Sequence, residues 1–165
     1  MSENIWAIQV VLDAAADDAR RLAGEAHYTG CRVRHESKTV ELWLFNAPMQ
    51  VVQELEAIRP GVYVIHNDAP RPLSAVDDLR DSFDWAARKS EGVKAVGVGP
   101  TEDGYLQVGV LDDVNGAQKK LDAIYGSNVV RVYKTEQPRA LPLYGPASVS
   151  REPTTEPLAW ASVPE

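Results

Sequence analysis

Cysteine is almost absent from the sequence: Cys31 is the only one, so no internal disulfide can form. The fold must therefore depend on its apolar core. Apolar residues make up 44% of the 165 residues and charged residues 25%, which is enough for an ordinary core and excludes disorder of the whole chain. A chain of this length forms one or two domains.

Positive charge is also in short supply, because 17 lysines and arginines stand against 24 aspartates and glutamates. The resulting net charge of −7 repels phosphate backbones. The basic residues are scattered, as Arg20, Arg34 and Lys119 illustrate, and they form no stripe. The sequence therefore predicts no nucleic-acid partner.

Long hydrophobic runs are missing as well. The first apolar run is interrupted at Asp13, well short of the roughly 18 residues that a membrane helix needs. Residues 1–4 are acidic where a secretory signal would be basic. These two features predict a cytoplasmic protein without a membrane span.

The first half of the chain reads as a strand followed by an α-β-β-α-β unit. Residues 5–12 are short, apolar and β-branched, which predicts a buried strand. Asp13 would then cap a helix that ends at Gly30. The remaining elements are expected to be a hairpin over 31–45, a helix opened by Pro48 and a strand over 62–65.

The second half repeats this order. A helix is expected from Ser74 to Ala87, with Val76, Leu79 and Phe83 on its inner face. The later elements are expected to be strands over 93–98 and 105–111 joined by a turn, a helix capped by Asp112 or Asp113 and ended by Gly126, and a strand over 129–133.

Matching residues support an internal duplication. At an offset of 66 residues, Leu44 matches Val110 and Leu55 matches Leu121. We therefore predict an α+β fold of tandem α-β-β-α-β repeats of the ferredoxin-like (α/β-plait) kind, each a small antiparallel sheet with helices on one face. The matches also include Leu42 with Val108, Ile58 with Ile124, and Pro70-Arg71-Pro72-Leu73 with Pro138-Arg139-Ala140-Leu141.

Three segments follow from this pattern. The first is 1–73, the N-terminal strand with the first unit; the second is 74–141, the second unit; the third is 142–165, an extended tail rich in Pro, Ser and Thr. Its prolines exclude a continuous helix. We expect the tail to act as an arm held by contact, with Tyr144 and Trp160 in apolar grooves of a neighbouring molecule.

The strands and the last helix of the second unit carry a family resemblance. The residues concerned are Val96-Gly97-Val98, Asp103 to Val110, Ala117, Leu121, Tyr125-Gly126 and Val129 to Val132. This pattern, which covers about a third of the chain, resembles the C-terminal lobe of prodomains of bacterial secreted serine proteases. Those prodomains are α/β folding chaperones and inhibitors that dock a sheet against the protease. The α-β-β-α-β order also resembles BON domains, which bind membranes or partner proteins. Both resemblances imply non-catalytic binding.

Candidate catalytic and metal residues are few. His27, Cys31 and His35 lie four apart, as soft metal ligands on a helix could, but Gly30 interrupts that helix and a fourth ligand is missing. No nucleophile signature surrounds Cys31. Pro100 spoils the dinucleotide-like glycines before it, and the paired aspartates fall at helix starts. We therefore predict no catalytic residue, no cofactor and no metal.

Aromatic residues suggest contact surfaces instead. Trp85 would lie about 150° from the centre of its helix's apolar face, and would need another surface to cover it. Trp43 lies on a strand that is apolar on both faces, so both faces must be covered, either by the other unit or by another chain. The residues proposed to bind a partner are Trp85, Tyr144, Leu158 and Trp160.

These observations favour a non-enzymatic protein–protein interaction module, such as an inhibitor or a chaperone-like protein. Its partner would be another protein or a second copy of the chain. One alternative is a structural subunit of a larger assembly, such as a phage particle or a homo-oligomeric shell. Another is a small-molecule sensor or an enzyme on a ferredoxin-like fold, since such folds have many functions.

Overall fold

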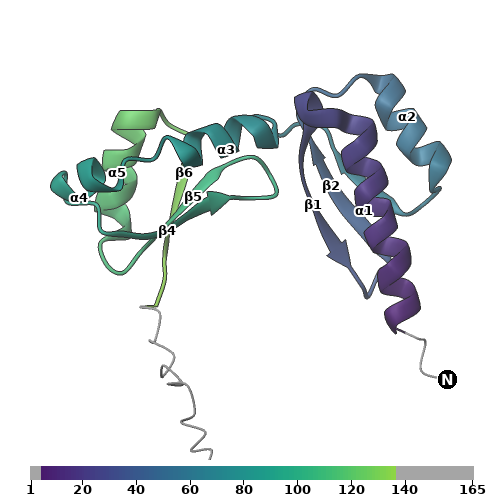
Figure 1. The fold of residues 1–165 in the computed structure, drawn as a ribbon, viewed down its shortest axis with the longest axis horizontal. Coiled ribbons are helices and arrows are strands. Elements are labelled where there is room, and N and C mark those ends of the chain that lie inside the picture. Colours follow the sequence, from purple (N-terminus) through teal and green to yellow (C-terminus); the bar gives the residue numbers. More distant parts are fainter. Residues whose placement is uncertain (1–4, 137–165) are drawn as a thin grey trace, which may run out of the picture.

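The computed structural model describes residues 5–136. This part of the chain contains five helices and two three-stranded sheets, so the predicted α+β class is confirmed (Figure 1). The expectations for Tyr144, Leu158, Trp160 and the rest of 137–165 lie outside the described residues.

The first unit follows the predicted α-β-β-α-β order. Strand β2 lies in the middle of its sheet, antiparallel to β1 and parallel to β3. The elements are α1 (Ile5–His27), β1 (Tyr28–Arg34), β2 (Thr39–Leu44), α2 (Met49–Ile58) and β3 (Tyr63–His66).

The second unit has the same strand order and the same strand directions. A register shift occurs at the same place in both units, between Tyr28 and Gly30 in β1 and between Ala95 and Gly97 in β4. The elements are α3 (Leu73–Asp81), α4 (Trp85–Ser90), β4 (Ala95–Pro100), β5 (Leu106–Val110), α5 (Val114–Tyr125) and β6 (Val130–Lys134).

The expectation of antiparallel sheets is wrong, because each sheet is mixed. A hairpin joins the first two strands of each unit, which makes them antiparallel. A helix joins the second strand to the third, and such a crossover returns the chain in the same direction. The two sheets are also separate in the described residues, side by side rather than merged (Figure 1).

The predicted strand over 5–12 is also wrong, since these residues form the first half of α1. No helix breaker separates them from the alanine-rich segment 14–19, and alanine favours the helix. Leu12, Ala15 and Ala19 then form one buried row. Asp13 therefore lies inside the helix rather than capping it. Gly24 interrupts its backbone with φ 64°, and the predicted end at Gly30 lies in β1.

The helix expected from Ser74 to Ala87 is divided in two. Between α3 and α4 the chain turns Phe83 into the second core. The side chain of Asp84 then caps α4 by accepting a hydrogen bond from the Ala87 N–H at 2.9 Å. The angle predicted for Trp85 assumed one continuous helix and therefore does not apply.

Each unit has its own apolar core, because the helices pack on one face of each sheet. Burial alternates along β2, with Val40, Leu42 and Leu44 buried and Glu41 and Trp43 half-buried on the other face. The opposite face of each sheet has no helix on it within the described residues, and the candidate site lies there. The main buried aliphatic residues are Leu12, Val40, Leu42, Leu44 and Leu55 in the first unit and Val76, Leu106, Val108, Val110 and Leu121 in the second.

Candidate functional site

The open face of the first sheet carries a row of aromatic and charged side chains. Trp43 lies in the middle of this row, on β2. The Arg32 guanidinium carbon lies 5.7 Å from the centre of its ring on one side. The ring of His66 stacks on the other side, with centroids 5.2 Å apart and planes 17° apart. Trp43 is therefore held between a cation and an aromatic ring.

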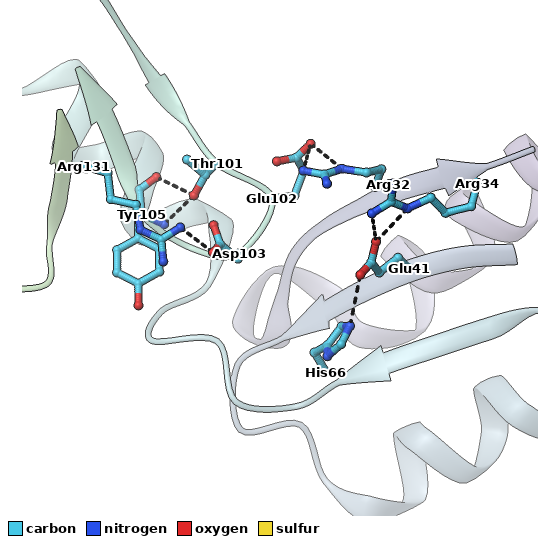
Figure 2. Close-up of polar contacts among 9 residues, drawn as sticks. All are labelled: Arg32, Arg34, Glu41, His66, Thr101, Glu102, Asp103, Tyr105 and Arg131. Atoms are coloured by element: carbon cyan, nitrogen blue, oxygen red, sulfur yellow. Dashed lines mark hydrogen bonds and ion pairs between the residues drawn. The ribbon is translucent and has the colours of Figure 1, made fainter. Parts of the chain in front are cut away.

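Glu41 fixes the polar end of the same face. Its Oε2 accepts hydrogen bonds from Arg34 Nη2 at 2.7 Å and Nε at 3.0 Å (Figure 2). These bonds hold the pKa of Glu41 below its ordinary value. Glu41 Oε1 also lies 3.4 Å from His66 Nε2, but that buried nitrogen makes no hydrogen bond among the described residues.

The open face of the second sheet carries a second fixed arginine. Arg131 lies over the ring of Tyr105, with its guanidinium carbon 3.5 Å from the ring centre. It donates to Asp103 Oδ2 at 2.6 Å (Figure 2). Burial favours a raised pKa for Asp103, but hydrogen bonds from Thr101 and Arg131 outweigh burial and lower it. Asp103 is therefore held as a carboxylate.

Two glycines leave part of the open face of the second sheet without side chains, next to Arg131. Gly97 and Gly109 are paired on β4 and β5, and Tyr133 lies next to Gly109 on β6. A Cβ atom on Gly109 would come within 2.9 Å of the Tyr133 hydroxyl oxygen. The missing side chain thus lets the phenol lie across the sheet.

The backbone comes very close to a glycine at two places where the two units meet, and these contacts hold the open faces near each other. A Cβ atom on Gly30 of β1 would lie 2.6 Å from the carbonyl oxygen of Glu102, in the β4–β5 loop. Gly104, in the same loop, has φ 89°, and a Cβ there would lie 2.9 Å from the Arg71 carbonyl oxygen. Thr29 Oγ1 donates to that same carbonyl at 3.0 Å. The loop therefore packs directly on the first unit and on the linker.

Arg71 fastens the linker between the units to the second sheet. Its guanidinium donates to the carbonyl oxygens of Gly104 at 3.0 Å, Asn128 at 3.2 Å and Val129 at 3.3 Å. Burial lowers the pKa of Arg71. Arg71, the arginine of the Pro-Arg-Pro-Leu motif, thus binds three backbone carbonyls of the second unit.

A cleft of about 520 Å³ lies between the two open faces. Arg32 and Glu102 form an ion pair across it at 3.2 Å (Figure 2). Its two cations and two carboxylates balance, so the lining has no formal net charge. A volume of this size is typical of ligand sites. The lining residues are Arg32, Trp43, Thr101, Glu102, Asp103, Gln107, Arg131, Val132 and Tyr133.

The cleft was not predicted, and Trp85, the predicted partner-binding residue that lies within the described residues, does not line it. Trp85 begins α4, is 50% exposed and contacts Phe83 edge to face at 5.1 Å. The signal that could have indicated the cleft was Trp43, on a strand whose other face is core. Arg32 and Glu102 give no such signal in the sequence, because their pairing depends on how the two units dock.

The three residues weighed as metal ligands take separate directions. His27 Nδ1 lies 3.0 Å from the Phe45 carbonyl oxygen, and His35 contacts Gln9. Cys31 Sγ accepts a hydrogen bond from the Tyr28 hydroxyl at 3.4 Å, and burial raises the pKa of that hydroxyl. Residues 5–136 contain no cluster of three or more His, Cys, Asp or Glu able to hold a metal ion.

Comparisons with protein-family models, with curated proteins and with solved structures gave no match for this chain. Among residues 5–136, none of the helices has both the length and the apolar character needed to cross a membrane.

Proposed function

We propose that the chain is a non-enzymatic protein-binding module, and that the cleft between its two sheets holds an extended segment of a partner protein. One observation carries the proposal: both walls of the cleft are already fixed. Gly30 and Gly104 allow backbone contact between the units, and Arg71 clamps the linker. A preformed site loses little ordering entropy on binding.

The chemistry of the lining fits a peptide segment. A peptide backbone offers alternating donors and acceptors, and the cleft offers donors on Arg32 and Arg131 and an acceptor on Glu102. Trp43 and Tyr133 supply flat apolar surfaces for side chains. Because the lining is electrically balanced, a segment with little net charge fits better than a strongly acidic or basic one.

The same lining supports a binding role more than a catalytic one. A general acid needs a carboxyl group whose pKa is raised toward neutrality. The pKa of Asp103 is lowered instead, and Arg131 holds the group in an ion pair. Glu102 is likewise paired with Arg32. These arginines position the carboxylates as fixed recognition groups.

We infer that each unit is an α/β plait without the first strand of the ferredoxin-like β-α-β-β-α-β order. In the complete fold the missing strand lies between the last two of the remaining strands. Without it, these two strands pair directly and in parallel, next to the antiparallel hairpin. Both sheets have this combination of one antiparallel and one parallel pair. We propose that the module acts as an inhibitor or a chaperone-like protein, as the prodomain resemblance implies. We also propose a cytoplasmic location.

Peptide selection tests this function. The full chain is used to select from displayed random peptides of about a dozen residues. Selected peptides should bind with an affinity that falls at least about tenfold in Trp43→Ala and Tyr133→Ala. Fluorescence polarisation measures the affinities, and circular dichroism verifies that each variant is folded.

Trp85→Ala provides the matched control, because it removes a half-exposed aromatic outside the cleft. It should leave peptide binding unchanged. Loss of binding in this variant alone would move the site to α4, as predicted from the sequence. Absence of any selected peptide would contradict the proposal.

A small ligand in the same cleft is the second candidate, favoured by the volume of about 520 Å³. Titration of the full chain with a small-molecule fragment library, followed by NMR, separates the two functions. Fragments that shift the resonances of Trp43 and Tyr133, combined with failure of the peptide selection, would favour the sensor.

A further inference from the structure

Apart from the hydrogen-bonded pair Gln9 and Asp13, the first half of α1 is apolar on its outer face as well as on its inner face. On the inner side, Leu12 and Ala15 are buried against the first sheet. On the outer side Trp6 is 79% exposed, Val10 67% and Val11 51%. A helix that is apolar all round is usually covered on all sides. This surface is separate from the cleft, so it is independent of the proposed function.

The exposed surface has a regular geometry. Trp6, Val10 and Ala14 are four residues apart and form one row along the helix, flanked by Ala7 and Val11. We call these five residues the α1 patch. Rows with this spacing form the ridges that pack into the grooves of a second helix.

Charged residues limit the patch on its C-terminal side. Asp18 forms ion pairs with Arg21 at 3.0 Å and with Arg59 at 2.8 Å. Its hydrogen bonds to Arg59 and Arg21 lower the pKa of Asp18. The apolar surface therefore covers only the first turns of α1 (purple in Figure 1) and ends at a fixed charge cluster.

We propose that the α1 patch binds the α1 patch of a second copy of this chain, with the two helices antiparallel. The side chains become smaller along the row, from Trp6 through Val10 to Ala14, and this order supports a second copy of the chain as the partner. With a two-fold axis at Val10, the large Trp6 of each copy lies opposite the small Ala14 of the other. The same surface on both subunits is then complementary to itself, as a two-fold interface requires.

The area of the patch sets the strength of this dimer. An indole buries 150–250 Å² when fully covered, so the patch offers on the order of 300–400 Å² per copy. Two copies bury roughly 700 Å², below the roughly 1,200 Å² of a stable interface. The dimer is therefore weak and depends on concentration. It also strengthens with salt, because each copy carries a net charge of −7.

Sedimentation equilibrium of the full chain tests the pairing. The average mass should rise from 18.1 kDa toward twice that value as the concentration increases from about 10 µM to about 1 mM. Val10→Lys and Val10→Glu should each remain monomeric, because like charges would meet at the axis. Val64→Lys is the matched control, since Val64 is 46% exposed on β3 of the same unit, and it should dimerise like the wild type.

A mixture of the two charge variants tests the antiparallel geometry itself. Val10→Lys and Val10→Glu should associate with each other, since opposite charges then face one another at the axis. A wild type that stays monomeric at about 1 mM in high salt would overturn the proposal. So would a Val10→Lys variant that still dimerises, or a mixture that stays monomeric while both variants are folded by circular dichroism.

Discussion

Gly30 and Gly104 allow the second unit to approach the first at the distance of backbone contact. They act for different reasons. Gly104 has φ 89°, a conformation that side chains rarely adopt, whereas Gly30 is needed only for space. The open cleft next to them therefore depends on two missing side chains.

Gly30→Ala tests this contact. Its new Cβ would lie 2.6 Å from a backbone oxygen of Glu102, so the β4–β5 loop must move. We expect a loss of about 1–3 kcal/mol in the free energy of unfolding, measured with urea. Gly99→Ala is the control, because no atom lies within 4 Å of its Cβ position. Equal stability of the two variants would show that the loop does not resist displacement.

Asp103 predicts a dependence on pH. Its pKa is lower in the folded than in the unfolded protein, so its contribution is complete above the unfolded value of about 3.9. The contribution is lost as the pH falls through the folded value. At pH 7 Asp103→Asn should be less stable by about 0.5–1 kcal/mol, since the Arg131 pair is partly exposed.

Urea unfolding from about pH 7 to about pH 2 measures this difference. The stabilities of the wild type and Asp103→Asn should converge below about pH 4. A difference that persists unchanged at about pH 2 would show that the substitution acts through packing rather than charge.

At the scale of the elements, α5 protects the edge of the second sheet. Strand β6 is an edge strand of this sheet. Gln118 Nε2 donates to the Val130 carbonyl oxygen at 2.9 Å, and its Oε1 accepts from the Val132 N–H at 2.8 Å. The amide thus occupies the positions that a neighbouring strand would use, and blocks unwanted strand pairing.

Gln118→Leu should expose this edge. We expect a loss of about 1 kcal/mol in unfolding free energy and faster aggregation, because both backbone groups lose their partner. Light scattering at a fixed temperature measures the aggregation. Gln118→Glu keeps the acceptor for Val132 but not the donor for Val130, so it should have an intermediate effect. Unchanged aggregation in both variants would leave the side chain without this role.

At the scale of the whole molecule, the two units have separate cores. Leu55 lies in the first core and Leu121 in the second. The polar contacts between the units include the Arg71 clamp, the hydrogen bonds made by Thr29 and Ser74, and the Arg32–Glu102 pair; α3 also packs against α1 and β1. Polar contacts of this kind fix the orientation of the two units but couple the stability of one core only weakly to that of the other.

Matched core variants test this independence. Leu55→Ala and Leu121→Ala should each cost about 2–5 kcal/mol, because both leucines are fully buried. Each should lower the urea midpoint of its own unit more than that of the other unit. NMR peak intensities followed through a urea titration report on the two units separately. A single shared midpoint in both variants would show that the molecule unfolds as one cooperative domain.

Most of the element order and the inner face of α3 follow from the sequence alone. Val76 on α3 was assigned correctly to the core, because helical spacing is a local property. Of the two predicted caps, Asp112 and Asp113, it is Asp113 that caps α5, and Gly126 ends the helix as predicted, since capping depends on a few neighbouring residues.

The helical state of 5–12, the parallel strand pairing and the cleft depend instead on tertiary packing. A short apolar run is compatible with a strand or a helix, and packing of α1 on the sheet selects between them. Arg32 and Glu102 are 70 residues apart, and their pairing depends on how the units dock. Periodicity determines which face of a strand is buried by its own unit. It carries no information on what lies opposite the other face, which is where the candidate site formed.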